Sequence, residues 1–218
     1  MTPTVVLLHG LLRSSRSMAG LARALEAAGY ATWVGSYPST ALSIERAAGG
    51  VADELHHRFG ERPLALVTHS LGGILARYLA GPLGVARGLR IEGVVMLAPP
   101  NAGSRLARTF GGVELFRRLY GPAGIELGAA ASGWPVPTAP TAVIAGTYPR
   151  GLNPVGWMSH AVGIIDDAEP SDGTVLVEET RLPGMVDFAT IEAGHTFIMD
   201  HPEAREMVLR FLREGRLR

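Results

Sequence analysis

The most informative segment of this chain reads Ala65-Leu66-Val67-Thr68-His69-Ser70-Leu71-Gly72-Gly73. An apolar run ends in a serine and a helical pattern follows, which predicts a buried strand that turns sharply into a helix. A serine hydroxyl is a poor nucleophile unless a base lies beside it and donors await the oxyanion. We therefore expect Ser70 to be a nucleophile in a strained turn, where neighbours such as Gly72 must be small.

The residue after this serine has a predicted role of its own. The N–H of Leu71 falls in the first turn of the expected helix, where unpaired amides and the helix dipole favour an anion. An alternative reading makes Ser70 an ordinary N-cap, which is common where a strand meets a helix. These nine residues alone do not decide between the two readings, so the rest of the chain has to be considered.

The composition limits the class of protein. A chain of 218 residues with 47% hydrophobic residues suits one domain with a substantial core. The formal net charge is +0, which argues against nucleic acid or an anionic membrane surface as a partner. The sequence has no cysteine, and this excludes disulfides, thiol catalysis and cysteine metal sites.

Apolar runs alternate with helical patterns along the chain. Val5 to Leu8 is the first such run, Ile91 to Leu97 is another, and both read as strands buried on two faces. The alternation predicts an α/β fold with a mostly parallel central sheet, helices on both faces, and ligands at the carboxyl ends of the strands. No apolar run approaches the ~20 residues that span a bilayer, and the N-terminus lacks the pattern of a secretory signal. We expect a cytoplasmic protein, although a secreted mature form is also compatible.

Thr68-His69-Ser70-Leu71-Gly72 resembles the nucleophile elbow G-x-S-x-G of the α/β-hydrolase superfamily. The sequence departs from that motif at Thr68, which stands where the first glycine is usual. The resemblance extends over essentially the whole chain and is closest to small bacterial lipase-like or esterase-like members. It implies a single α/β-hydrolase domain over residues 1–218.

The pair His9-Gly10 follows the first expected strand. In the superfamily, such a pair shapes a loop whose next backbone N–H forms half of the oxyanion hole, which nominates the N–H of Leu11. The second donor would be the N–H of Leu71. The plainer alternative is that Gly10 only makes a turn between a strand and a helix.

Two further sites would complete the chemistry. Ser171-Asp172-Gly173-Thr174-Val175 resembles the acid loop of bacterial lipase-like hydrolases, so Asp172 is the expected acid, with Asp166 and Asp167 as alternatives and a surface turn as the plain reading. Gly194-His195 follows the last expected strand, Val186 to Ile191. The chain order Ser, Asp, His matches the superfamily, which makes His195 the expected base ahead of His201 and His160.

A segment at 101–140 interrupts the alternation of strands and helices. Apolar residues recur in it at helical spacing, interrupted by Gly111-Gly112; these residues are Leu106, Phe110, Val113, Phe116 and Tyr120. Insertions at this point in the superfamily often cover the active site, so we expect a small helical lid. An ordinary helix packed on the sheet is equally compatible with the spacing.

The resemblance implies a serine hydrolase that cleaves carboxylic esters, of small molecules or lipids, through an acyl-enzyme on Ser70 without a metal or organic cofactor. An acyltransferase or a thioesterase would use the same three side chains. A binding protein that keeps the fold without chemistry is the non-enzymatic alternative. Two locations are equally compatible with a group of apolar residues: the lining of a substrate pocket and the protein core. These residues are Trp157, Phe197, Leu11 and Leu12.

Overall fold

The computed structural model describes residues 2–128, 133–149, 163–166 and 168–218. A six-stranded sheet forms the centre of the molecule, with the order β2-β1-β3-β4-β5-β6. The strands are β1 (Thr4–Leu8), β2 (Thr32–Gly35), β3 (Pro63–His69), β4 (Arg90–Leu97), β5 (Thr141–Gly146) and β6 (Asp187–Ile191). Every pair of neighbouring strands is parallel, as the alternating pattern predicts.

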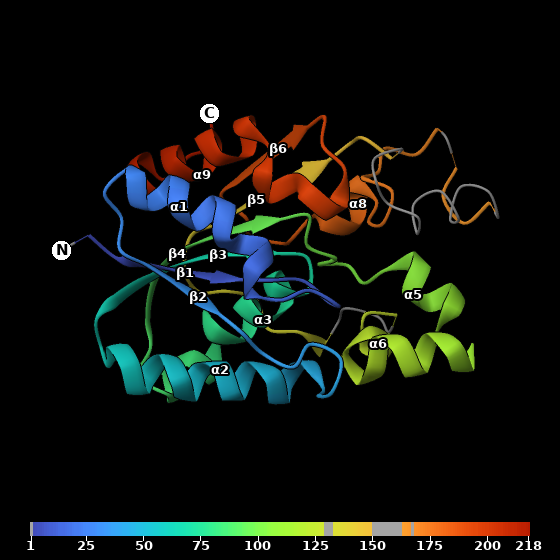
Figure 1. Ribbon diagram of the computed structural model, residues 1–218, viewed down its shortest axis with the longest axis horizontal. Helices are drawn as coiled ribbons and strands as arrows, with labels where there is room; N and C mark the ends of the chain where they lie inside the picture. Colours follow the sequence, from blue (N-terminus) through green and yellow to red (C-terminus); the bar gives the residue numbers. More distant parts are fainter. Residues whose placement is uncertain (1, 129–132, 150–162, 167) are drawn as a thin grey trace.

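Helices cover both faces of this sheet (Figure 1). On one face lie α1 (Ala19–Ala27) and α9 (Pro202–Glu214), and on the other lie α2 (Ile44–Phe59) and α3 (Leu71–Leu79). Two apolar clusters of buried residues follow the same division, one between the sheet and each helical layer. The central strands are buried on both faces for this reason, and their continuous apolar runs follow from it.

The expected elements differ from the observed ones mainly at their ends. The second strand was expected from Tyr30 to Val34 and instead runs Thr32–Gly35, because the chain is still completing the turn after α1, with Tyr30 N–H bonded to the carbonyl of Leu25. Ser43 caps α2 as expected, since its Oγ accepts the N–H of Arg46. The serines before α1 form a 3₁₀ helix, η1 (Ser15–Met18), and Ser14 at its start makes no capping bond.

The segment 101–140 contains two helices, α5 (Arg105–Phe110) and α6 (Glu114–Glu126), with a kink in α6 at Gly121. Both lie beyond the carboxyl ends of the strands (Figure 1). The Glu126 carboxylate at the end of α6 accepts the N–H of Ile44, so α6 is attached to the start of α2. The short helices α4 (Pro82–Ala86) and α8 (Val177–Thr180) and the 3₁₀ helix η3 (His195–Asp200) complete the described elements.

Among the described residues, three that are not glycine have positive φ angles, and all three follow central strands. Leu12 (φ 57) follows β1, Ser70 (φ 52) follows β3, and Ala98 (φ 49) follows β4. Left-handed backbone costs free energy at any residue with a Cβ atom. Backbone strain is therefore concentrated at the carboxyl edge of the sheet.

Candidate active site

Ser70 lies in the turn between β3 and α3, with φ 52 and ψ −121. Its backbone N–H donates to the carbonyl of Leu97 on the neighbouring strand, 2.9 Å away. Ser70 occupies the N-cap position of α3, as the alternative reading has it, but its side chain makes no capping bond to the helix. The strained turn expected from the sequence is present, and it leaves the hydroxyl available to other partners.

The glycines around this turn are required by close backbone contacts. A Cβ atom on Gly72 would lie 2.7 Å from the carbonyl oxygen of Leu8 and 2.8 Å from that of His9. A Cβ atom on Gly10 would lie 2.9 Å from Nδ1 of His69. Contacts this short do not occur with real side chains, so the loop after β1 reaches the serine turn only because both positions lack a Cβ.

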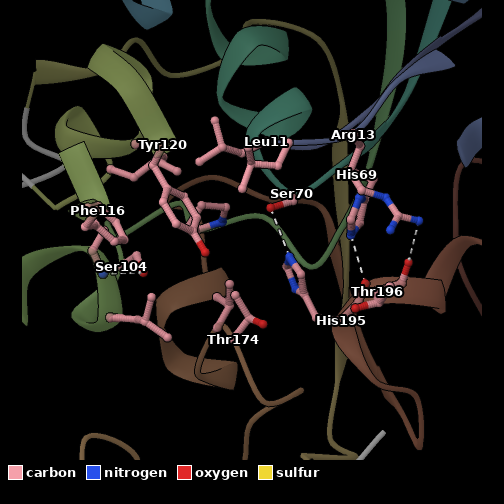
Figure 2. A pocket seen from close by; sticks show the side chains of 17 residues that line it. Leu11, Arg13, His69, Ser70, Ser104, Phe116, Tyr120, Thr174, His195 and Thr196 are labelled. Atoms are coloured by element: carbon pink, nitrogen blue, oxygen red, sulfur yellow. Dashed lines mark hydrogen bonds between the residues drawn. The ribbon is translucent and has the colours of Figure 1, made fainter. Parts of the chain in front are cut away.

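The structure brings Ser70, His195 and Asp172 into one chain of hydrogen bonds. Nε2 of His195 lies 3.0 Å from the hydroxyl of Ser70 (Figure 2). Nδ1 of His195 lies 2.6 Å from Oδ2 of Asp172. Because a carboxylate only accepts, Nδ1 carries the proton and donates it, which leaves Nε2 to accept from the serine.

Asp172 is 1% exposed and held by its own loop. Its Oδ1 accepts the N–H groups of Thr174 at 2.9 Å and Val175 at 2.8 Å, so Oδ2 is left for the imidazole. Asp166 is exposed and accepts the N–H of Ala168 instead. Asp167, His160 and Trp157 lie outside the described residues. His201 precedes α9 as its N-cap, as expected.

His69, which the sequence placed in the serine turn without a further role, supports the loop that carries His195. Its Nε2–H donates to the backbone carbonyl of His195 at 2.9 Å, and the two rings lie 4.9 Å apart (Figure 2). Complete burial, helped by the nearby His195, holds the pKa of His69 well below its usual value. The one signal in the sequence was a polar imidazole at the end of an otherwise apolar strand.

His9 is also buried and shapes the loop after β1. Its Nδ1–H donates to the carbonyl of Gly10 at 2.9 Å, and its ring stacks on that of Tyr37 with 4.3 Å between centroids. The hydroxyl of Tyr37 donates to the carbonyl of His9. Burial lowers the pKa of His9, which favours the neutral form of the ring that fixes this loop.

The two amides expected to bind an oxyanion are the N–H groups of Leu11 and Leu71. Leu71 is the first residue of α3, and Leu11 follows the His9-Gly10 pair. Neither N–H donates a hydrogen bond to another described residue. Both amides therefore keep a donor for a ligand.

A cavity of about 280 Å³ opens beside Ser70 and His195 (Figure 2). One wall is largely apolar and comes from α5, α6 and the residue after α6; it includes Leu106, Ala107, Phe116, Tyr120 and Leu127. Leu11 and Leu12 line the cavity, whereas Phe197 is half exposed and is not part of the lining. The apolar wall can hold a hydrocarbon group beside the serine hydroxyl.

Arg77 of α3 has a structural role that the sequence did not indicate. Its buried guanidinium donates hydrogen bonds of 2.7 to 2.8 Å to three backbone carbonyls, those of Asn101, Trp134 and Pro135. Asn101 begins the 101–140 segment, and the other two residues lie near its end. Burial lowers the pKa of Arg77 to about 10. Three carbonyl acceptors thus hold a cation where no described carboxylate pairs with it, and they attach the segment to the helix that follows Ser70.

Within the part of the chain that the structure describes, no group of three or more His, Cys, Asp or Glu side chains is arranged to hold a metal ion. The described helices include none with the length and apolar character needed to cross a bilayer.

Solved structures of bacterial and metagenomic hydrolases resemble this fold. The mature form of the Bacillus licheniformis lipase BlEst2 has a TM-score of 0.74 and 20% identity, with 97% of this chain and 91% of that chain covered. A metagenomic carboxyl esterase also has a TM-score of 0.74 and 20% identity, with coverage of 98% and 76%. The phospholipase PlaB from Legionella pneumophila has a TM-score of 0.71 and 17% identity, with coverage of 98% and 60%.

No curated protein sequence is similar enough to this chain to count as a match. A family profile described as "alpha/beta hydrolase fold" matches residues 3–114, which is more than half of the chain and includes β1 to β4 and the Ser70 turn. The parallel sheet, the helices on both faces and this match agree with one another, and the chain therefore belongs to the α/β-hydrolase fold family.

Proposed function

We propose that this protein is a serine hydrolase that cleaves carboxylic esters through an acyl-enzyme on Ser70. The observation that carries the proposal is the chain of hydrogen bonds from Ser70 through His195 to Asp172. In this chain of hydrogen bonds, the base His195 is placed to activate the serine, and the buried carboxylate of Asp172 is placed to orient the base. The names of the lipase and the carboxyl esterase with this fold are consistent with the same chemistry.

In the proposed reaction, Oγ of Ser70 attacks the ester carbonyl while Nε2 of His195 takes the hydroxyl proton. The carbonyl oxygen becomes an oxyanion, which the N–H groups of Leu11 and Leu71 bind. His195 then gives its proton to the leaving alcohol, and the acyl group remains on Ser70. Asp172 keeps the imidazole in the required tautomer and stabilises its protonated form.

Water completes the cycle by the reverse sequence. His195 takes a proton from the water, the hydroxide attacks the acyl carbonyl, and the acid leaves as Ser70 regains its proton. Each oxyanion donor commonly stabilises the transition state by about 3 kcal/mol. The position of the two amides therefore matters for the rate about as much as the identity of Ser70, His195 and Asp172. The steps need no metal or organic cofactor, and residues 1–218 would act as one domain.

The apolar wall favours an acyl chain or lipid tail as the part of the substrate that it holds. We propose that α5 and α6 act as the lid over this wall, since they supply its side chains and lie beyond the strand ends. Arg77 would then fix both ends of the lid segment, so that its helices form the adjustable part.

Hydrolysis of 4-nitrophenyl butyrate tests this function. We expect turnover by the wild-type protein and its loss in Ser70→Ala, with an unchanged circular dichroism spectrum. A fluorophosphonate probe should label Ser70, as mapped by mass spectrometry. Ser104→Ala is the matched control, because Ser104 lines the same cavity but caps α5 and makes no bond to His195. Retained turnover in Ser70→Ala would remove Ser70 from the mechanism.

Product analysis separates hydrolysis from acyl transfer and thioester cleavage. The wild-type protein is given the butyrate ester with and without a primary alcohol, and butyryl thioesters are tested in parallel. We expect free butyrate as the main product and oxygen esters as the faster substrates. A butyrate ester of the added alcohol as the main product would instead identify an acyltransferase.

A further inference from the structure

The cavity beside Ser70 has a second wall of different character. Arg13 and Thr196 line it. In Figure 2, Arg13 and Thr196 lie on one side of the Ser70–His195 pair, and Phe116, Tyr120 and Ser104 lie on the other. Among the described lining residues, Arg13 is the only one of the types Asp, Glu, Lys or Arg. The cavity is therefore apolar at one end and cationic at the other.

The guanidinium of Arg13 is incompletely paired. One Nη2–H donates to the carbonyl of Thr196 at 3.2 Å, and the guanidinium carbon lies 5.7 Å from the centre of the Phe197 ring. Nε of Arg13 is buried and has no hydrogen-bond partner among the described residues. No described carboxylate lies within 4.0 Å of this guanidinium, whereas Arg105, Arg108 and Arg205 each have one.

Arg13 lies close to the groups that we propose to react. Arg13 is two residues beyond Leu11, whose N–H we assign to the oxyanion. It bonds to the carbonyl of Thr196, the residue directly after His195. After burial, which is the main cause, the charge of Arg13 also contributes to the lowered pKa values of His9 and His69, which agrees with its place beside these side chains.

We propose that Arg13 binds an anionic group, a carboxylate or a phosphate, on the alcohol part of the ester substrate. This inference rests on the proposed function and specifies its substrate. The apolar wall takes the acyl chain, so the alcohol part extends to the opposite wall, on the side of the guanidinium. A partly buried arginine without a carboxylate has N–H donors in a fork that fits either anion, and water screens the attraction less there than at the surface.

Three esters with the same acyl chain test the proposal: 3-(butyryloxy)benzoate, its neutral carboxamide, and 3-(butyryloxy)phenyl phosphate. Each kcat/KM is divided by the rate of hydroxide-catalysed hydrolysis of the same ester, because the phenols differ as leaving groups. We expect at least one anionic ester to exceed the carboxamide by about tenfold or more in the wild-type protein, with a smaller ratio at high salt. The anion with the larger ratio identifies carboxylate or phosphate as the recognised group.

Variants of Arg13 locate the effect. In Arg13→Gln, the preference for the anionic esters should fall to about one, while turnover of the carboxamide stays within about threefold of wild type. Arg13→Lys should keep part of the preference. Arg16→Gln is the matched control, because Arg16 is exposed on the adjoining helix η1 and is not part of the cavity lining. It should keep the full wild-type ratio.

Two results would overturn the inference. One is equal turnover of anionic and neutral esters by the wild-type protein. The other is an equal loss on all three esters in Arg13→Gln, which would mean that Arg13 only holds the loop at Thr196. If no ester is turned over, the proposed function fails, and the anion site is tested separately by calorimetry with the amide analogues 3-(butyramido)benzoate and 3-(butyramido)benzamide. A tenfold tighter binding of the benzoate that disappears in Arg13→Gln supports the site, and equal binding rejects it.

Discussion

Asp172 and His195 are joined twice. The imidazole Nδ1 of His195 donates to Oδ2 of Asp172 at 2.6 Å, and the backbone N–H of His195 donates to the carbonyl of Asp172 at 3.0 Å. The first bond fixes the orientation of the imidazole ring, and the second fixes the position of the loop that carries it. A change that alters only the carboxylate therefore leaves the loop in place, which makes Asp172 suitable for a test of chemistry rather than of folding.

Asp172→Asn should lower kcat by roughly 10³ to 10⁴ with little change in KM, because an amide can hold the imidazole in the wrong tautomer and cannot stabilise its charge. The measurement is steady-state hydrolysis of 4-nitrophenyl butyrate. Asp166→Asn is the control, since Asp166 is exposed and bonds to Ala168 rather than to His195. If Asp166→Asn lost activity and Asp172→Asn kept it, the assignment of the acid would be wrong.

Acid should destabilise the protein partly through His69. Its pKa is lowered in the folded state by burial, then by the nearby His195, with smaller contributions from Arg13 and His9. The unfolded state therefore binds the proton first, and stability that is fully present above about pH 6.5 is lost as the pH falls, by up to about 1.4 kcal/mol per pH unit. His69→Gln keeps a donor for the carbonyl of His195 but cannot ionise.

Urea unfolding of the wild-type protein and His69→Gln at pH 8.0 and pH 5.5 measures this effect. The difference at pH 8.0 gives the cost of repacking, and the variant should lose less stability between the two pH values. His9, whose pKa is also lowered by burial, should retain part of the pH dependence in this variant. Equal losses in the two proteins would show that His69 does not contribute.

Phe116 should set the length of the acyl chain. Its ring is buried, lines the cavity, and stacks on that of Tyr120 with 4.2 Å between centroids. Phe116→Ala should move the best 4-nitrophenyl ester to a chain about two or more carbons longer, because the removed ring leaves apolar volume. Phe110 packs behind Phe116 without lining the cavity, so Phe110→Ala should have a smaller effect in the same direction.

Leu115→Ala is the control for this series, because Leu115 is on the same helix and is 66% exposed. Its chain-length profile should match that of the wild-type protein. An unchanged profile in Phe116→Ala would count against the apolar wall as the acyl site.

Two alanine substitutions should shift stability in opposite directions. Gly72→Ala places a Cβ 2.7 Å from the carbonyl oxygen of Leu8, and we expect a loss of about 2–3 kcal/mol in the free energy of unfolding. Gly49→Ala on α2 meets no atom within 4 Å, and we expect a gain of about 0.5–1 kcal/mol from helix propensity. Chemical denaturation checks both values. A neutral Gly72→Ala would show that the loop after β1 can move away from the serine turn.

Local patterns in the sequence predicted the fold, and the resemblance to the α/β-hydrolase superfamily was needed to nominate the site residues. Buried parallel strands have continuous apolar runs, and the nominated residues Ser70, Asp172 and His195 each follow a recognisable pattern near the end of a strand or in a loop. The structure brings these three side chains into contact, while their catalytic roles stay predictions. The ends of β2 were misplaced because Tyr30 favours strands and Gly35 does not, whereas Tyr30 lies in the turn after α1 and Gly35 ends the strand.

Contacts between distant residues could not be read from the sequence. His69 bonds to a carbonyl 126 positions away, and Arg77 and Arg13 bond to backbone carbonyls, which every residue has. A carbonyl acceptor leaves no signature in residue type. These positions therefore looked like an ordinary polar strand end, helix residue and loop residue until the chain was folded.

Leu12, Ser70 and Ala98 each add about 1–3 kcal/mol of backbone strain at the carboxyl edge of the sheet, where the candidate site lies. The remainder of the molecule must supply that energy, so the edge of the sheet that carries the candidate site is also its most strained. Selection for heat resistance alone would favour glycine at Leu12 and Ala98, and would thereby loosen the loops around Ser70. Thermostable variants that keep their turnover should accordingly carry their changes on the outer helices.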